Sequence, residues 1–81
     1  MDKPTDSQLS ALRWIKNRNG DGLFERNNAV LMAAGERAPV MRSTWNHLVR
    51  LGLMELYHNN RRIRMTDAGK AVDLRNVEES A

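Results

Sequence analysis

The chain has 81 residues, of which 41% are hydrophobic and 28% charged, as is typical of one small globular domain. It has no cysteine, which excludes a disulfide framework and a zinc site built on thiolates. The net charge is +3, and the positive excess lies in residues 36–66, which hold six arginines and only two acidic residues.

Neither a targeting segment nor a membrane span is visible in the sequence. The first residues, Met1 to Pro4, lack the apolar region of a signal peptide. The longest apolar run, Ala29 to Ala34, has six residues, far fewer than the roughly 20 that a membrane-spanning helix needs. We therefore expect a soluble cytoplasmic protein without a membrane partner.

The first element that the pattern predicts is a helix from about Thr5 to Asn19. Thr5 and Gln8 match a capping box. Leu9, Ala11, Leu12 and Ile15 share one face of the helix, and Trp14 falls outside it. The turn residues 19–22 then end the helix.

A short strand at residues 23–25 precedes a second predicted helix. Asn27 or Asn28 would be its N-cap, and Gly35 would end it in a left-handed conformation. Its buried stripe would contain Val30, Leu31 and Ala34.

A third helix is predicted from Pro39 to about Leu51, since proline is tolerated in the first turn of a helix. On a helical wheel its apolar side contains Met41, Trp45, Leu48 and Val49. The opposite side is wholly polar and contains Ser43, Asn46, His47 and Arg50, with Arg42 at its edge.

Two strands at residues 53–58 and 61–66 follow, and Asn59-Asn60 would join them as a two-residue hairpin turn. In the second strand Ile63 and Met65 alternate with Arg62 and Arg64, so one face is expected to be buried and the other basic. A fourth helix from Asp67 to about Asn76, capped by Thr66, completes a single domain at residues 5–76. The termini, 1–4 and 77–81, are expected to be flexible.

The predicted fold is mainly α with a small β-hairpin, in the order helix-strand-helix-helix-strand-strand-helix. Thr44 to Leu53 resembles the end of a recognition helix that runs into a first wing strand. Arg61 to Gly69 resembles the return strand of the wing and its Thr-x-x-Gly helix start. The chain is therefore similar to the winged helix-turn-helix domains of MarR-like and related bacterial regulators. This resemblance implies a small transcriptional regulator that binds double-stranded DNA sequence-specifically.

The candidate DNA-binding residues lie on the third helix and on the hairpin. Asparagine can pair with adenine and arginine with guanine in the major groove, and arginines can also hold phosphates. The helix would supply Arg37, Arg42, Ser43, Asn46, His47 and Arg50. The wing, on the adjacent backbone, would supply His58, Asn59, Asn60, Arg61, Arg62 and Arg64.

Two other functions fit the same basic surface. A winged helix can also serve as an interaction module, here for an acidic protein partner, and a basic face by itself does not distinguish duplex DNA from structured RNA. A homodimer is a further possibility. Trp14 would then be either an interface residue or a core residue packed under the C-terminal helix.

An enzyme is not expected, because the nucleophile-elbow and glycine-rich phosphate-binding motifs are missing. Ser43 and His47 are one helical turn apart but have no third orienting group. The only histidines, His47 and His58, fall on different elements, so neither a metal site nor a cofactor is predicted.

Overall fold

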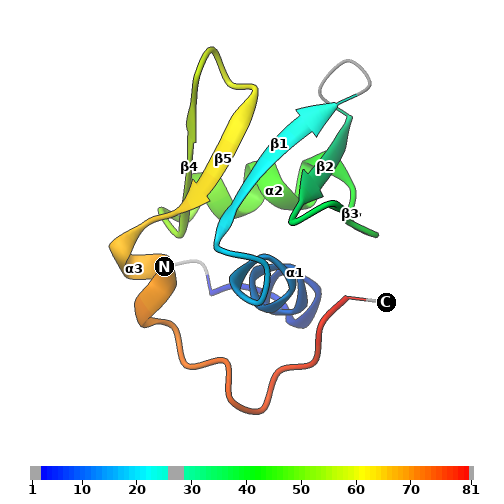
Figure 1. Cartoon of the computed structure of the whole chain (residues 1–81). Coiled ribbons are helices and arrows are strands. Elements are labelled where there is room, and N and C mark those ends of the chain that lie inside the picture. Colours follow the sequence, from blue (N-terminus) through cyan, green and yellow to red (C-terminus); the bar gives the residue numbers. More distant parts are fainter. Residues whose placement is uncertain (1–2, 26–28, 81) are drawn as a thin grey trace.

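The computed structural model describes residues 3–25 and 29–80 and has an antiparallel five-stranded sheet at its centre (Figure 1). The strand order across the sheet is β3-β2-β1-β5-β4, and α2 crosses behind the sheet while α1 lies at its lower end (Figure 1). The elements in chain order are α1 (Asp6–Lys16), β1 (Asp21–Glu25), β2 (Val30–Ala33), β3 (Glu36–Arg37), α2 (Arg42–Arg50), β4 (Met54–Tyr57), β5 (Arg62–Met65) and α3 (Asp67–Ala71).

This order overturns the winged helix prediction, because a strand replaces the second predicted helix. In β2, Leu31 and Ala33 are buried whereas Val30 and Met32 are only partly buried, which is the two-residue period of a strand. Phe24 pairs with Leu31 across β1 and β2. The proposed caps of that helix, Asn27 and Asn28, lie outside the described residues.

Gly35, which was predicted to end that helix, and Ala34, which was placed in its buried stripe but is exposed, form the turn between β2 and β3. Ala33 pairs with Glu36, so the turn has two residues, and their φ angles are +51° and +78°. Two successive positive φ angles are characteristic of a type I′ hairpin turn, which glycine favours. Gly35 does adopt the left-handed conformation that the sequence predicts, but it does so in a hairpin turn and not at the end of a helix.

The predicted capping box of α1 is confirmed. The Thr5 hydroxyl accepts a hydrogen bond from the Gln8 backbone N–H at 3.2 Å, and Gln8 Oε1 accepts one from the Thr5 N–H at 2.9 Å. The helix ends at Lys16, before the expected Asn19, because Asn19 has a φ of +74° and cannot continue a right-handed helix.

Helix α2 is shorter than predicted and begins at Arg42, with Met41 as its N-cap in an extended conformation. Trp45 and Leu48 are fully buried, as the helical wheel predicts. Met41 is 74% exposed, so its assignment to the core was wrong. Because Met41 lies before the first helical residue, the position that a helical wheel assigns to its side chain does not apply.

The β4–β5 hairpin is confirmed, but its connection is longer than predicted. Tyr57 pairs with Arg62, so four residues, 58–61, connect the strands where two were expected. His58, Asn59 and Asn60 all have positive φ angles, and the Arg61 N–H donates to the His58 carbonyl at 3.1 Å.

After β5 the chain forms a short helix, α3, and the described residues beyond it form no further helix or strand. Thr66 caps α3 by accepting from the Gly69 N–H at 3.0 Å, but the helix ends at Ala71 and not near Asn76. Residues 72–80 then pass beneath α1 (Figure 1). Leu74 is buried in the core and the Ser80 N–H donates to the Ser10 carbonyl at 3.3 Å.

Trp14 is 3% exposed and belongs to the hydrophobic core. Its ring is therefore not on the surface, and its role as an interface residue for a second copy of the chain was wrong. Within residues 3–25 and 29–80, no helix is both long and apolar enough to cross a membrane.

Candidate nucleic-acid interface

The candidate residues on α2 and on β5 lie on opposite faces of the sheet. Ile63 and Met65 are buried in the same core as Trp45 and Leu48 of α2. Because side chains alternate along a strand, Arg62 and Arg64 point away from α2. The α2 face and these two arginines therefore do not form one surface, contrary to the arrangement expected for a recognition helix and its wing.

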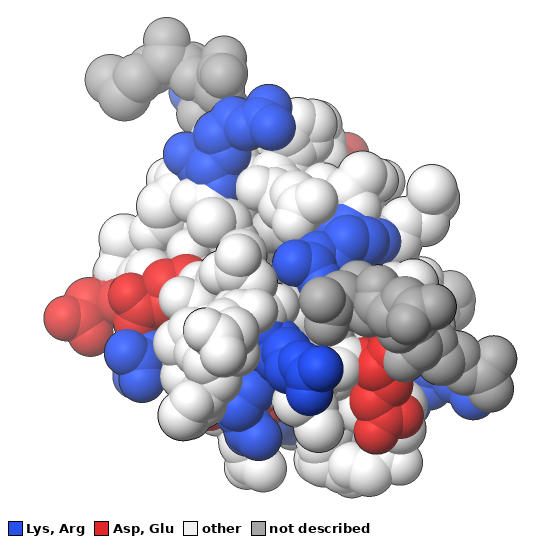
Figure 2. All heavy atoms as spheres, turned by 90° about the horizontal axis from the view of Figure 1, so that it is seen from above, with Lys and Arg blue, Asp and Glu red and all other residues white. Residues whose placement is uncertain are grey.

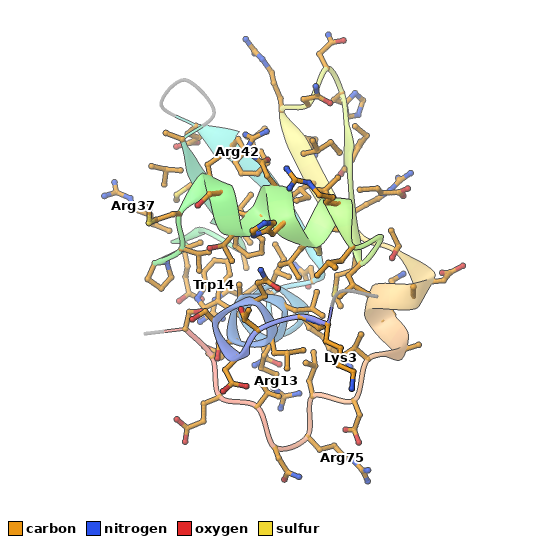
Figure 3. The ribbon with its side chains drawn as sticks, turned by 180° about the vertical axis from the view of Figure 1, so that it is seen from behind. Lys3, Arg13, Trp14, Arg37, Arg42 and Arg75 are labelled. Carbon is orange, nitrogen blue, oxygen red and sulfur yellow. The ribbon has the colours of Figure 1, made fainter. Side chains whose placement is uncertain are left out.

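The outward side of α2 is polar and free of acidic residues (Figure 3). No aspartate or glutamate occurs between Arg37 and Met54. Among the described residues, neither Arg37 nor Arg50 has an ion pair. The side chains exposed here are those of Ser43, Asn46, His47 and Arg50. Arg37 is also exposed, but it pairs with Met32, which is in register with Leu23 and Arg62, so its side chain lies on the same sheet face as that of Arg62.

Arg42 is held against the sheet and orients Asn46. Its guanidinium carbon lies 3.8 Å from the centre of the Phe24 ring, and its partial burial lowers the pKa of Arg42. Its Nε donates to Asn46 Oδ1 at 3.1 Å. This bond settles which way the Asn46 amide points, because only the oxygen can accept it. The oxygen keeps a second lone pair, and Nδ2 stays a donor.

His47 is oriented in a similar way by α1. Gln8 Nε2 lies 3.2 Å from His47 Nδ1, and Gln8 Oε1 is already committed to the Thr5 N–H. The amide nitrogen must therefore be the donor and Nδ1 the acceptor. A neutral His47 then carries its proton on Nε2, so the capping box of α1 determines the tautomer of a histidine on α2.

The two β5 arginines are paired with side chains of the open sheet face. Arg62 Nε donates to the Tyr57 hydroxyl at 3.0 Å, and Nη2 contacts Asp21 Oδ1 at 3.3 Å. The Tyr57 hydroxyl donates to the same carboxylate. Arg64 Nε pairs with Glu55 Oε1 at 2.5 Å. The hydrogen bond to Tyr57 raises the pKa of Arg62, and that to Glu55 raises the pKa of Arg64.

These ion pairs offset the positive charge that the sequence pattern of β5 predicts for its outward face.

Figure 2 looks down on the end of the molecule that carries the β4–β5 connection. Lys and Arg groups are separated there by uncharged surface, and acidic groups lie near the rim. The connection between β4 and β5 is exposed, and it contains His58, Asn59, Asn60 and Arg61. The structure thus joins Ser43, Asn46, His47 and Arg50 into one surface and leaves Arg37, Arg62 and Arg64 outside it.

A hollow beside α2 contains residues that sequence reasoning missed. It has a volume of about 270 Å³ and lies between the start of α1 and the end of α2. Lys3 and Gln8 reach it although they are more than 35 residues from His47 in sequence, and no local pattern links residues so far apart. Its lining residues are Lys3, Thr5, Gln8, His47, Arg50 and Leu51.

Comparison of the chain with protein-family models, curated proteins and solved structures finds no match. In the part of the chain that the structure describes, no three of its histidine, aspartate and glutamate residues are grouped so that they could hold a metal ion. The geometry of the α2 surface is therefore the feature that indicates a function.

Proposed function

We propose that the protein binds double-stranded DNA by placing α2 in the major groove. One observation carries this proposal: α2 presents an exposed, acid-free side on which Asn46 is held ready for two hydrogen bonds. A nine-residue helix is about 13 Å long, comparable to the roughly 12 Å width of the major groove.

Asn46 is the residue that would read a base. Adenine offers an N6 donor and an N7 acceptor in the major groove, which match the Oδ1 acceptor and Nδ2 donor of asparagine. Arg42 acts through Asn46 as a positioning residue, because its Nε–H bond to Oδ1 restrains the amide before DNA arrives. Pre-orientation lowers the entropy lost when the complex forms.

The last turn of α2 would contact the phosphate backbone. Arg50 is the last residue of α2 and is exposed, so one cation lies a helical turn beyond Asn46 on the same side of the helix. Phosphate contacts fix the register of a protein on DNA, and base contacts supply the sequence preference.

Selection of random duplex DNA by the purified full chain tests this function. The enriched duplex is then measured by fluorescence anisotropy at several salt concentrations. Asn46→Ala should weaken binding to it by about 1–3 kcal/mol and relax the preference at one A·T pair. Arg50→Ala should weaken binding to all duplexes and lower the salt slope by about one.

The matched controls are Asn76→Ala and Arg75→Ala, which change the same residue types at exposed positions after α3. They should bind like the unaltered chain. If no duplex is enriched, or if all four variants bind alike, the proposal is wrong. If duplex RNA of the same sequence competes equally, the ligand is RNA and not DNA. If the chain captures an acidic protein but binds no duplex DNA, the alternative of a protein-interaction module is favoured.

A further inference from the structure

The hollow between α1 and α2 has the composition of an anion site. Two of its lining residues, Lys3 and Arg50, are cations, and none of the described residues that line it is acidic. Figure 3 shows Lys3 on the segment that leads into α1. The acidic residue of the first turn of α1, Asp6, lines two other hollows and not this one.

The neutral side chains of the hollow also favour an anion. Since Gln8 donates to Nδ1 of His47, the other ring nitrogen, Nε2, carries the proton and is a hydrogen-bond donor. Lysine and arginine are donors only. Lys3, His47 and Arg50 therefore all line one small space to which the described residues bring donors and no carboxylate.

We propose that this hollow holds one phosphate group of the bound nucleic acid. The inference rests on the proposed function, because Arg50 and His47 belong to α2 and the hollow adjoins its last turn. A strand whose bases face Asn46 would then be held by its phosphate at the end of α2, between the two helices. The site would set the register of α2 on the duplex.

The first test uses duplexes in which one phosphate at a time is replaced by a neutral methylphosphonate. For the unaltered chain, one internal position should lower the affinity more than its neighbours. For Lys3→Gln, which lacks the cation, the same replacement should have no further effect, and the salt slope should fall by about one. Lys16→Gln, at the other end of α1, is the matched control and should behave like the unaltered chain.

A comparison of 5′-phosphorylated with 5′-hydroxyl duplexes separates two sources of the phosphate. An effect at an internal position indicates a backbone phosphodiester, and an effect only at the end indicates a terminal phosphate. If duplexes bind normally but Lys3→Gln changes neither the salt slope nor the methylphosphonate pattern, the hollow is not a phosphate site, and the role of α2 is unaffected.

A DNA-free measurement separates failure of the site from failure of the proposed function. Inorganic phosphate is titrated into the full chain, and the amide NMR signals of Thr5, Gln8 and His47 are followed. If no duplex binds, shifts of these signals that Lys3→Gln abolishes still support the anion site, and only the proposed function fails. Absence of both duplex binding and phosphate shifts overturns both.

Discussion

The guanidinium of Arg18 lies over the ring of Trp14, with 4.3 Å between its central carbon and the ring centre. Its Nη1 also donates to the Trp14 carbonyl at 2.9 Å. Two carboxylates complete its surroundings, Glu36 at 3.0 Å and Glu79 at 3.1 Å. Arg18 therefore joins the end of α1, strand β3 and the C-terminal segment, and its side chain is only 15% exposed.

Replacement of Arg18 should lower the stability of the fold. Arg18→Gln removes the ion pairs to Glu36 and Glu79 and the cation over Trp14, so contacts among three segments are lost together. We expect a lower thermal midpoint by circular dichroism. Arg75→Gln is the control, because the one ion pair that Arg75 makes with a described residue is local, to Asp73 two residues away. Equal midpoints for the two variants would show that the Arg18 cluster does not stabilise the protein.

Acid should weaken the attachment of the C-terminal segment. Asn17 Nδ2 donates to Glu79 Oε2 at 2.6 Å, and this bond, with Arg18, lowers the pKa of Glu79 from its ordinary value of 4.5. A folded pKa below the unfolded one gives stability that is complete above 4.5 and is lost as the pH falls from there through the folded pKa.

The pH dependence of urea unfolding measures this effect. In Glu79→Gln the position no longer titrates, so the free energy of unfolding should fall less steeply with acidification below pH 4.5 than in the unaltered chain. Glu78→Gln is the matched control, because Glu78 is exposed and has no ion pair among the described residues. A Glu79→Gln profile identical to that of the unaltered chain would contradict the prediction.

Local signals in the sequence predicted the elements that local interactions determine. Thr5 and Gln8 cap α1 through bonds between residues three apart, and Trp45 lies on the buried side of α2. The apolar run at Ala29 to Ala34 was ambiguous, because so short a run fits a buried helix as well as a strand. Pairing of Leu31 with Phe24 decides for the strand, and the sequence does not reveal that pairing.

In the candidate DNA-binding residues, too, local features could be predicted and long-range contacts could not. The helical wheel correctly gave Asn46, His47 and Arg50 as exposed, because exposure on a helix follows from its period. The sheet register determines which residues the arginines of β5 contact. In this register Arg64 is paired with Asp21 on one side and with Glu55 on the other. The charge of a segment therefore gave no indication of how much of it is neutralised in the fold.

Gly69 should not tolerate a larger residue. A Cβ at this position would lie 2.0 Å from the Leu53 carbonyl oxygen, and backbone atoms cannot move aside without shifting the start of β4. Gly69→Ala should therefore destabilise the protein by about 3 kcal/mol or more, measured by urea unfolding. The control is Gly52→Ala, where the Cβ would meet open space but the φ is +79°, at a cost of about 1–2 kcal/mol. A smaller loss for Gly69→Ala than for Gly52→Ala would contradict this packing argument.

Arg62 and Arg64 should contribute little to DNA binding, although β5 is the most arginine-rich strand. Both point to the face opposite α2, and their partners Asp21 and Glu55 offset their charge. Arg64→Gln should therefore leave the affinity for the selected duplex and the salt slope unchanged, whereas Arg50→Gln lowers the slope by about one. Both are exposed arginines changed to the same amide, so the pair isolates the face on which the charge lies. A slope that falls for Arg64→Gln and not for Arg50→Gln would move the interface from α2 to the open face of the sheet.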